Sequence, residues 1–343
     1  MRRCVLNTNG TVNYYLEAND STLKADGVTG SVLDGTDGNV MVEIPKFYYK
    51  YNYNVTSGVV HEHTVSLVPI VGGTVHPAFI QNGVEKDYRY APAYQGSDVG
   101  GKLMSVSGAY VKTDITRDAF RTLAEANGAG WHVYDWLLYE AAILLFVIEY
   151  GSLNLQSAFG EGRTCLTGGA WANSSYYGIH GNSNSDGNFS NNNQEGADSV
   201  TKVDADNAEA DLVYMTYRGI ENFWGNVYLF LDGINVNDNV VYLNDNPATF
   251  ADDTTTNYTQ DVTMVAANGY SSELANSNKG FFPTAVAGSN STHTGDYYAQ
   301  NIGWRVVYVG GSAADGLYTG ALHLRAYDAS ADDFVSVGSA VSF

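Results

Sequence analysis

The segment of residues 134–150 constrains the fold most, because it combines helical spacing with apolar side chains on nearly every side. Its apolar residues recur on one helical face, and the other positions are almost as apolar. A helix without a polar face has to be buried, so we expect it to lie under a sheet at the centre of the protein and to end at Gly151. Its uncharged apolar run, residues 141–148, is far too short to span a bilayer.

Only one other segment shows a helical period. Thr116 is a suitable N-cap, Phe120 and Leu123 share one face of the helix that would follow, and Gly128 is a natural stop. Elsewhere β-branched and aromatic residues alternate with Gly-rich turns, which is typical of strands and loops. Two early helices followed by strands and long loops predict an α+β fold. Strands are expected at residues 40–51, 59–71, 223–233, 261–266, 304–309, 320–325 and 335–343.

The chain divides by composition into an N-terminal arm and one large domain. Residues 1–38 are polar and contain one Asn-Gly and three Asp-Gly turns, which indicates a short β-rich arm or attachment segment. Residues 39–343 form the domain, with a Gly/Asn-rich stretch at about 160–215. A flexible linker and an ordered insertion both fit that stretch; the aromatic residues interleaved in it favour the insertion.

Charge and composition restrict the partners. A formal net charge of -20 would repel the phosphates of nucleic acid and anionic membranes, so neither is an expected partner. The 26 tyrosines and 37 glycines are unusual for a cytosolic enzyme and favour an extracellular or virion surface. Because Met1-Arg2-Arg3 is not followed by an apolar stretch, no secretory signal is predicted at this end.

The sequence offers no motif for catalysis, and we expect no enzyme. It contains no His-Glu-x-x-His, phosphate loop or Gly-x-Ser-x-Gly elbow. His61 and His63 could share a metal on one strand face, although two solvated histidines are the simpler interpretation. Ca²⁺ could bind at Asp204 and Asp206 or at Asp252 and Asp253, which ordinary acidic turns explain equally well.

The order of several motifs resembles phage and prophage tail proteins with a C-type-lectin-like domain of the formylglycine-generating-enzyme type. This group includes the major tropism determinants and the variable proteins of diversity-generating retroelements. The resemblance implies small antiparallel sheets with two helices, long loops that display a ligand near the C-terminus, and a trimer. The motifs are Val42-Glu43-Ile44-Pro45, His76-Pro77-Ala78-Phe79, Gly130-Trp131, Ile148-Glu149-Tyr150-Gly151, Asn222-Phe223-Trp224-Gly225, Asp232-Gly233-Ile234-Asn235 and Gly303-Trp304.

Residues 310–343 are the expected display surface. In the resembling proteins, retroelements mutate adenines of Asn codons here, which cannot produce Lys, Glu, Gln, Met or Trp; this segment contains none of the five. An ordinary β-rich C-terminus is the alternative. Aromatic and polar side chains suit ligand contact. The expected ligand-facing residues are Ala313, Ala314, Asp315, Leu317, Tyr318, His323, Arg325, Tyr327, Asp328, Asp333 and Phe334.

These observations predict a receptor-binding adhesin on a phage tail fibre or tail tip. Its expected partners are a host cell-surface protein or glycan, other virion proteins and two further copies of the chain. A structural virion decoration or fibre protein without receptor binding is the alternative. A glycan hydrolase is a third hypothesis, because it needs only two suitably spaced carboxylates among the 37 acidic residues.

Overall fold

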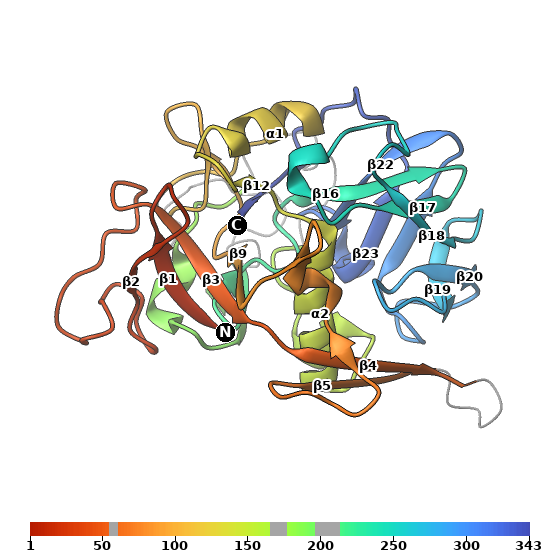
Figure 1. The fold of residues 1–343 in the computed structure, drawn as a ribbon, viewed down its shortest axis with the longest axis horizontal. Helices are drawn as coiled ribbons and strands as arrows, with labels where there is room; N and C mark the ends of the chain where they lie inside the picture. Colours follow the sequence, from red (N-terminus) through yellow and green to blue (C-terminus); the bar gives the residue numbers. More distant parts are fainter. Residues whose placement is uncertain (55–60, 165–176, 196–212) are drawn as a thin grey trace.

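A computed structural model describes residues 1–54, 61–164, 177–195 and 213–343. It is mostly β, with 38% strand and 14% helix, and contains a curled sheet of eight consecutive strands to which a ninth, short strand is paired (Figure 1). The predicted α+β, C-type-lectin-like class with two helices is therefore wrong. The physical reason is that many strands have only two to five residues, too few for an alternating pattern to appear in the sequence.

The N-terminal sheet joins segments that the sequence had separated. Its order is β2-β1-β3-β9, and every pairing is antiparallel. Residues 1–38 thus supply two strands of a sheet that continues into the predicted domain. Successive residues of β1 point into two different cores, with Val5 in one and Cys4 and Leu6 in the other. The strands are β1 (Arg2–Leu6), β2 (Val12–Tyr15), β3 (Asn39–Pro45) and β9 (Tyr88–Pro92).

The long strand expected at residues 40–51 is two strands in two sheets. After Pro45, which has no N–H for a ladder, the chain leaves the first sheet and enters a hairpin that projects from the body (Figure 1). The hairpin sheet has the order β5-β4-β6. Its strands are β4 (Tyr48–Tyr53), β5 (His61–Ser66) and β6 (Thr74–Val75).

The C-terminal sheet carries the segment expected to display a ligand. Its order is β18-β17-β16-β22-β23-β21-β19-β20, with β24 paired to β16. The β21–β23 and β16–β24 pairings are parallel, so residues distant in sequence become neighbours. The strands are β16 (Tyr228–Asn237), β17 (Val240–Leu243), β18 (Thr259–Thr263), β19 (Gly269–Leu274), β20 (Pro283–Val286), β21 (Tyr297–Gln300), β22 (Trp304–Gly310), β23 (Gly320–Ala326) and β24 (Val337–Gly338).

Helix α2 (Trp136–Tyr150) is buried at the centre, as its composition predicted. The Asp135 side chain caps it by accepting a hydrogen bond from the Leu138 amide (3.0 Å), and Gly151 ends it at φ 64°. Its Tyr139 hydroxyl donates to the Ala321 carbonyl of β23 (2.9 Å), which fixes the helix to the C-terminal sheet. No helix within the described ranges is long and apolar enough to cross a membrane.

The remaining elements are short. Helix α1 (Arg117–Glu125) begins after Thr116, whose hydroxyl accepts from the Ala119 amide, and confirms the second predicted helix. Helix α3 (Leu155–Phe159) was not predicted. Most of the predicted insertion at 160–215 lies outside the described residues. The other strands are β7 (Ile80–Gln81), β8 (Val84–Glu85), β10 (Ser97–Asp98), β11 (Leu103–Met104), β12 (His132–Val133), β13 (Asn191–Glu195), β14 (Val213–Tyr217), β15 (Ile220–Glu221) and β25 (Val341–Ser342).

Candidate functional site

A pocket of about 300 Å³ opens beside the C-terminal sheet, and three of the predicted ligand-facing residues line it. Asp315, Arg325 and Phe334 come from a loop, from β23 and from the loop before β24. Tyr228 of β16 and Tyr308 of β22 complete its aromatic wall. We call this cavity the C-terminal pocket. It exists because β16, β22 and β23 are adjacent in the sheet.

The cation of the pocket is held by one carboxylate and two rings. Arg325 Nε donates to Asp328 Oδ2 (3.2 Å), which also accepts a hydrogen bond from the Tyr308 hydroxyl. The guanidinium carbon lies 5.0 Å from the centre of the Tyr327 ring and 5.6 Å from that of Tyr308. The Arg325 side chain keeps 33% of its surface exposed, so part of the guanidinium can still meet a ligand.

A second chain of polar contacts fixes Tyr228. Burial raises the pKa of its hydroxyl well above the usual value, and the Asp315 charge adds to this rise. The Tyr228 hydroxyl lies 3.5 Å from His323 Nε2, while His323 Nδ1 lies 2.7 Å from the Tyr318 carbonyl oxygen. Burial lowers the pKa of His323. The neutral imidazole therefore donates from Nδ1 to Tyr318 and accepts at Nε2 from Tyr228.

The predicted ligand-facing residues divide by exposure. His323 and Ala313 are buried, so they support the surface from beneath instead of facing solvent. Asp315 is held in place by the Ser312 amide (2.8 Å) and hydroxyl. Ala314, Asp328 and Phe334 are partly buried. The exposed members are Leu317, Tyr318, Tyr327 and Asp333.

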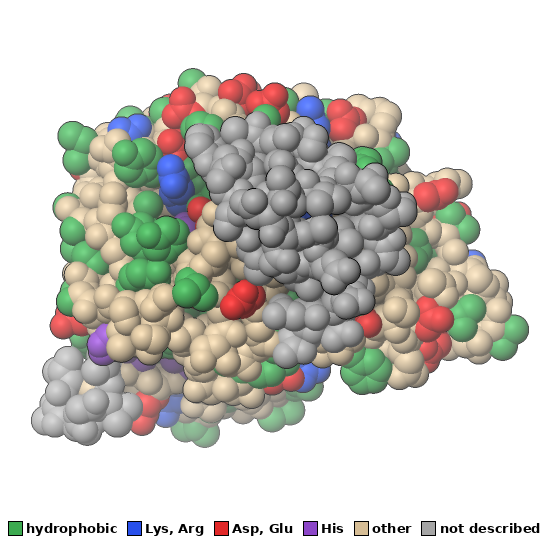
Figure 2. All heavy atoms as spheres, turned by 180° about the vertical axis from the view of Figure 1, so that it is seen from behind, with side chains coloured by type: hydrophobic (Ala, Val, Ile, Leu, Met, Phe, Trp, Pro, Cys, Tyr) green, Lys and Arg blue, Asp and Glu red, His purple; other side chains and the backbone are tan. Residues whose placement is uncertain are grey.

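Sequence reasoning missed two tyrosines that belong to this surface. Tyr297 packs against the exposed Tyr318 ring with centroids 4.7 Å apart, and Tyr270 lies 5.9 Å from the same ring. We call these three residues the tyrosine patch. Figure 2, which views the molecule from behind, shows hydrophobic side chains gathered on the side of the molecule that holds the C-terminal strands. No local signal in the sequence could identify Tyr270 and Tyr297, because the parallel β21–β23 pairing brings them there.

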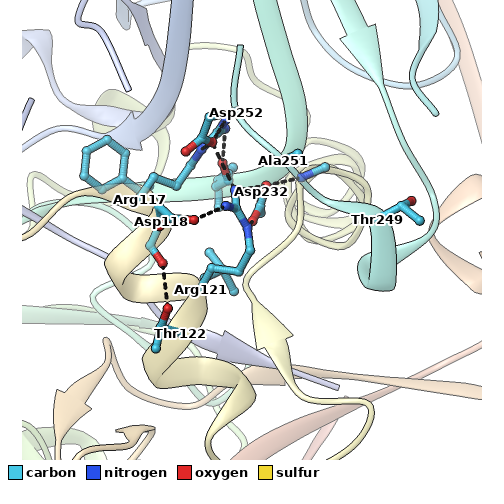
Figure 3. Close-up of polar contacts among 12 residues, drawn as sticks. Arg117, Asp118, Arg121, Thr122, Asp232, Thr249, Ala251 and Asp252 are labelled. Carbon is cyan, nitrogen blue, oxygen red and sulfur yellow. Dashed lines mark hydrogen bonds and ion pairs between the residues drawn. The ribbon is translucent and has the colours of Figure 1, made fainter. Parts of the chain in front are cut away.

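The Ca²⁺ candidates do not form a cation site in the described part of the chain. Asp252 accepts hydrogen bonds from Arg117 Nε (2.7 Å) and Arg121 Nη2 (3.0 Å), and Arg121 Nε donates to Asp232 (2.8 Å). Figure 3 shows both arginines reaching from α1 to these carboxylates. We call these four residues the buried ion cluster. Two guanidinium groups already neutralise the carboxylates, so the cluster serves to hold α1 on β16.

Two other metal hypotheses were drawn from the sequence. Asp204 and Asp206 lie outside the described residues. The Nδ1 atoms of His61 and His63 each lie 2.9 Å from a tyrosine hydroxyl, of Tyr51 and Tyr49 respectively. Across residues 1–54, 61–164, 177–195 and 213–343, no three His, Cys, Asp or Glu side chains are grouped to hold a metal ion.

A larger cavity, of about 600 Å³, lies between the β7–β8 hairpin, the end of α1 and residues Pro247–Thr249. Its one aromatic lining residue, Trp131, is 2% exposed and donates its indole N–H to the Thr8 carbonyl (2.8 Å). The cavity therefore offers a ligand no aromatic face. The C-terminal pocket, with exposed rings beside it, is the stronger candidate.

Comparison with known proteins does not identify the function of this site. No family model and no curated protein matches this chain. The resemblance to phage tail proteins accordingly rests on the motifs alone, and the function has to be argued from the geometry.

Proposed function

We propose that this protein is a receptor-binding protein of a phage virion, and that it binds its receptor through the C-terminal pocket and the tyrosine patch. The observation that carries the proposal is that Asp315, Arg325 and Phe334, all partly exposed, line one cavity, while two exposed rings are tied to it. The Tyr327 ring lies 5.0 Å from the Arg325 guanidinium carbon, and the Tyr318 carbonyl contacts His323, which in turn contacts the pocket residue Tyr228. Aromatic rings supply contact area at low entropic cost, and the guanidinium and carboxylate give directed hydrogen bonds. This argument for the binding surface does not depend on a lectin-like architecture.

The state of the polar groups supports binding more than catalysis. Burial raises the pKa values of both pocket tyrosines, Tyr228 and Tyr308, well above their ordinary value, so neither hydroxyl ionises near neutral pH. Asp328 is engaged by Tyr308 and Arg325, and Asp315 by Ser312. Glycan hydrolysis needs one carboxyl that can donate a proton and one that is free to act as base or nucleophile. Engaged carboxylates suit that task poorly.

A structural virion decoration or fibre protein without receptor binding is the second candidate. A decoration protein buries its surface aromatics against a virion partner. In the single chain Tyr318 is 48% and Tyr327 is 38% exposed, so both rings are accessible to a receptor or to a virion partner, and cell binding distinguishes the two. Virion attachment and assembly as a homotrimer are part of the proposal and rest on the motif resemblance.

The test is binding of fluorescently labelled protein to intact bacterial cells. A strain that the wild-type protein binds is first identified in a panel, and the variants are then compared on that strain. We expect Tyr318→Ala/Tyr327→Ala to lose at least about tenfold in affinity, since each change removes an exposed ring.

The matched control removes two exposed rings elsewhere, Tyr88→Ala/Phe189→Ala, which are 47% and 55% exposed in the wild type. This variant should bind as the wild type does, with both variants melting at the wild-type temperature. Equal loss in both variants would contradict a localised site. Absence of binding across the panel would favour the decoration function.

A further inference from the structure

A second groove, of about 350 Å³, runs between the β4–β5 hairpin and the β19–β20 strands. Figure 1 shows the hairpin beneath these two strands, where it leaves the body of the molecule. Tyr53 and His61 line the hairpin side, and Ser272, Glu273 and Thr284 line the opposite side. His293, from the loop before β21, lines it as well. None of these residues belongs to the C-terminal pocket.

One face of the hairpin is a ladder of aromatic rings that ends in this groove. Tyr51 pairs with His63 and Tyr53 with His61 across the two strands. The Tyr53 and His61 ring centres are 5.3 Å apart, and the His61 and His63 rings are stacked at 6.3 Å. Exposure increases along the ladder from Tyr49, at 3%, to Tyr53, at 40%. The buried rungs hold the last ring in place, so Tyr53 presents a supported aromatic face.

Three polar groups around the groove have no partner within the protein as described. Neither a hydrogen bond nor an ion pair engages the Tyr53 hydroxyl, the Glu273 carboxylate or the His293 imidazole among the described residues. By contrast, the hydroxyls beneath them are used internally: Ser271 donates to the Glu273 carbonyl (3.0 Å) and Thr294 to the Ser271 carbonyl (2.9 Å). The base of the groove is therefore fixed, while its rim keeps donors and acceptors for a ligand.

We propose that this groove binds a neutral glycan, at a site separate from the C-terminal pocket. A sugar ring needs a flat apolar face to stack on and several hydrogen-bonding groups directed at its hydroxyls, and the groove supplies both. Leu153 and Leu274 add apolar surface. The Glu273 carboxylate and the net charge of -20 disfavour an anionic sugar. Burial lowers the pKa of His61, so that ring adds no positive charge at neutral pH.

The experiment is isothermal titration of the full chain with hexasaccharides of glucose, mannose, galactose and N-acetylglucosamine, and with hexagalacturonate as the anionic probe. We expect at least one neutral hexasaccharide to bind saturably and hexagalacturonate to bind at least about tenfold more weakly. Tyr53→Ala should weaken binding about tenfold, and Tyr53→Phe, which keeps the ring, only about twofold. Glu273→Gln should weaken binding less than Tyr53→Ala does.

The matched control is Tyr318→Ala, an exposed tyrosine of the tyrosine patch, which should leave titration of the hexasaccharide unchanged. Loss of cell binding in that variant with intact sugar binding would separate the two sites. The proposal is overturned if none of the four neutral hexasaccharides binds. It is equally overturned if binding is unchanged in both Tyr53→Ala and Glu273→Gln, or if hexagalacturonate binds as tightly as the neutral sugars.

Discussion

The molecule contains two groups of arginine and aspartate that use the same chemistry for different ends. In the buried ion cluster, Arg117 is fully buried, and its Nη1 also donates to the Leu231 (3.1 Å) and Ile234 (2.8 Å) carbonyls. At the C-terminal pocket, Arg325 has one carboxylate partner and keeps a third of its side chain exposed. A guanidinium whose donors are all used inside the protein stabilises the fold. A guanidinium that keeps unused N–H donors can bind a ligand.

Breaking the buried ion cluster should have the largest effect. Asp232→Asn removes the fully buried carboxylate that Arg121 Nε contacts and leaves Arg121 with Asp252 and the exposed Asp118. Removing one member of a buried ion pair costs about 3–5 kcal/mol. Because Asp232 is fully buried, we expect a loss of that size in the free energy of unfolding, measured by urea denaturation. Asp232 does not line the C-terminal pocket, so we expect normal cell binding by the folded fraction. A loss below about 1 kcal/mol would mean that water or rearranged neighbours satisfy Arg121.

The second largest effect is expected from acid, which should lower the free energy of unfolding through the buried His180. Burial, and after it the positive charge of Arg163, lowers the pKa of His180 to about 3. Between that value and the ordinary pKa of about 6.5, the unfolded chain takes up a proton at this site and the folded chain does not. The free energy of unfolding therefore has its full value, as far as His180 is concerned, above pH 6.5. It falls by up to about 1.4 kcal/mol per pH unit as the pH drops toward 3.

The measurement is the melting temperature between pH 7.5 and 4.5 for the wild type and for His180→Gln. The substituted protein should show a shallower decline with pH, whereas His293→Gln, at an exposed position, should follow the wild-type curve. Identical slopes in all three proteins would show that His180 is not the responsible group.

The pocket arginine should affect binding more than stability. Arg325→Ala removes a half-buried ion pair with Asp328, for which we expect at most about 1 kcal/mol of unfolding free energy. Loss of the cation and of its stacking on Tyr327 should weaken cell binding about tenfold, and Arg325→Lys should recover only part of it. If Arg325→Ala destabilised the protein as strongly as Asp232→Asn does, the contrast between the two groups would disappear.

The smallest effect is expected at the exposed rim of the buried ion cluster. Asp118 pairs with Arg121 Nη1 at 2.9 Å, yet its side chain is 76% exposed. Asp118→Asn should therefore change the free energy of unfolding by less than about 1 kcal/mol. Compared with Asp232→Asn by the same denaturation experiment, it isolates burial as the variable, because both aspartates pair with the same arginine.

Helices and strands were predictable where the residues of one segment are enough to specify them. Thr116 and Gly151 mark helix boundaries through their own chemistry, and the apolar surface of α2 requires burial whatever covers it. The strands β22 and β23 were also located, to within one residue at each end, from the expected ranges 304–309 and 320–325. The predicted strand at 335–343 is instead two separate two-residue strands, β24 and β25, which pair with different partners.

The sequence by itself determined the two longer helices, α1 and α2, the acidic charge and a C-terminal segment rich in residues suited to binding. Only the tertiary structure decided which of those residues share a pocket, because strand order and register place Tyr228 and Tyr308 beside Arg325. The same pairing buries His323 and exposes Tyr318, five residues apart. Periodicity reports how a segment prefers to fold. Periodicity carries no information about which distant segment will lie beside a given strand. The pairing of distant segments forms both the pocket and the groove.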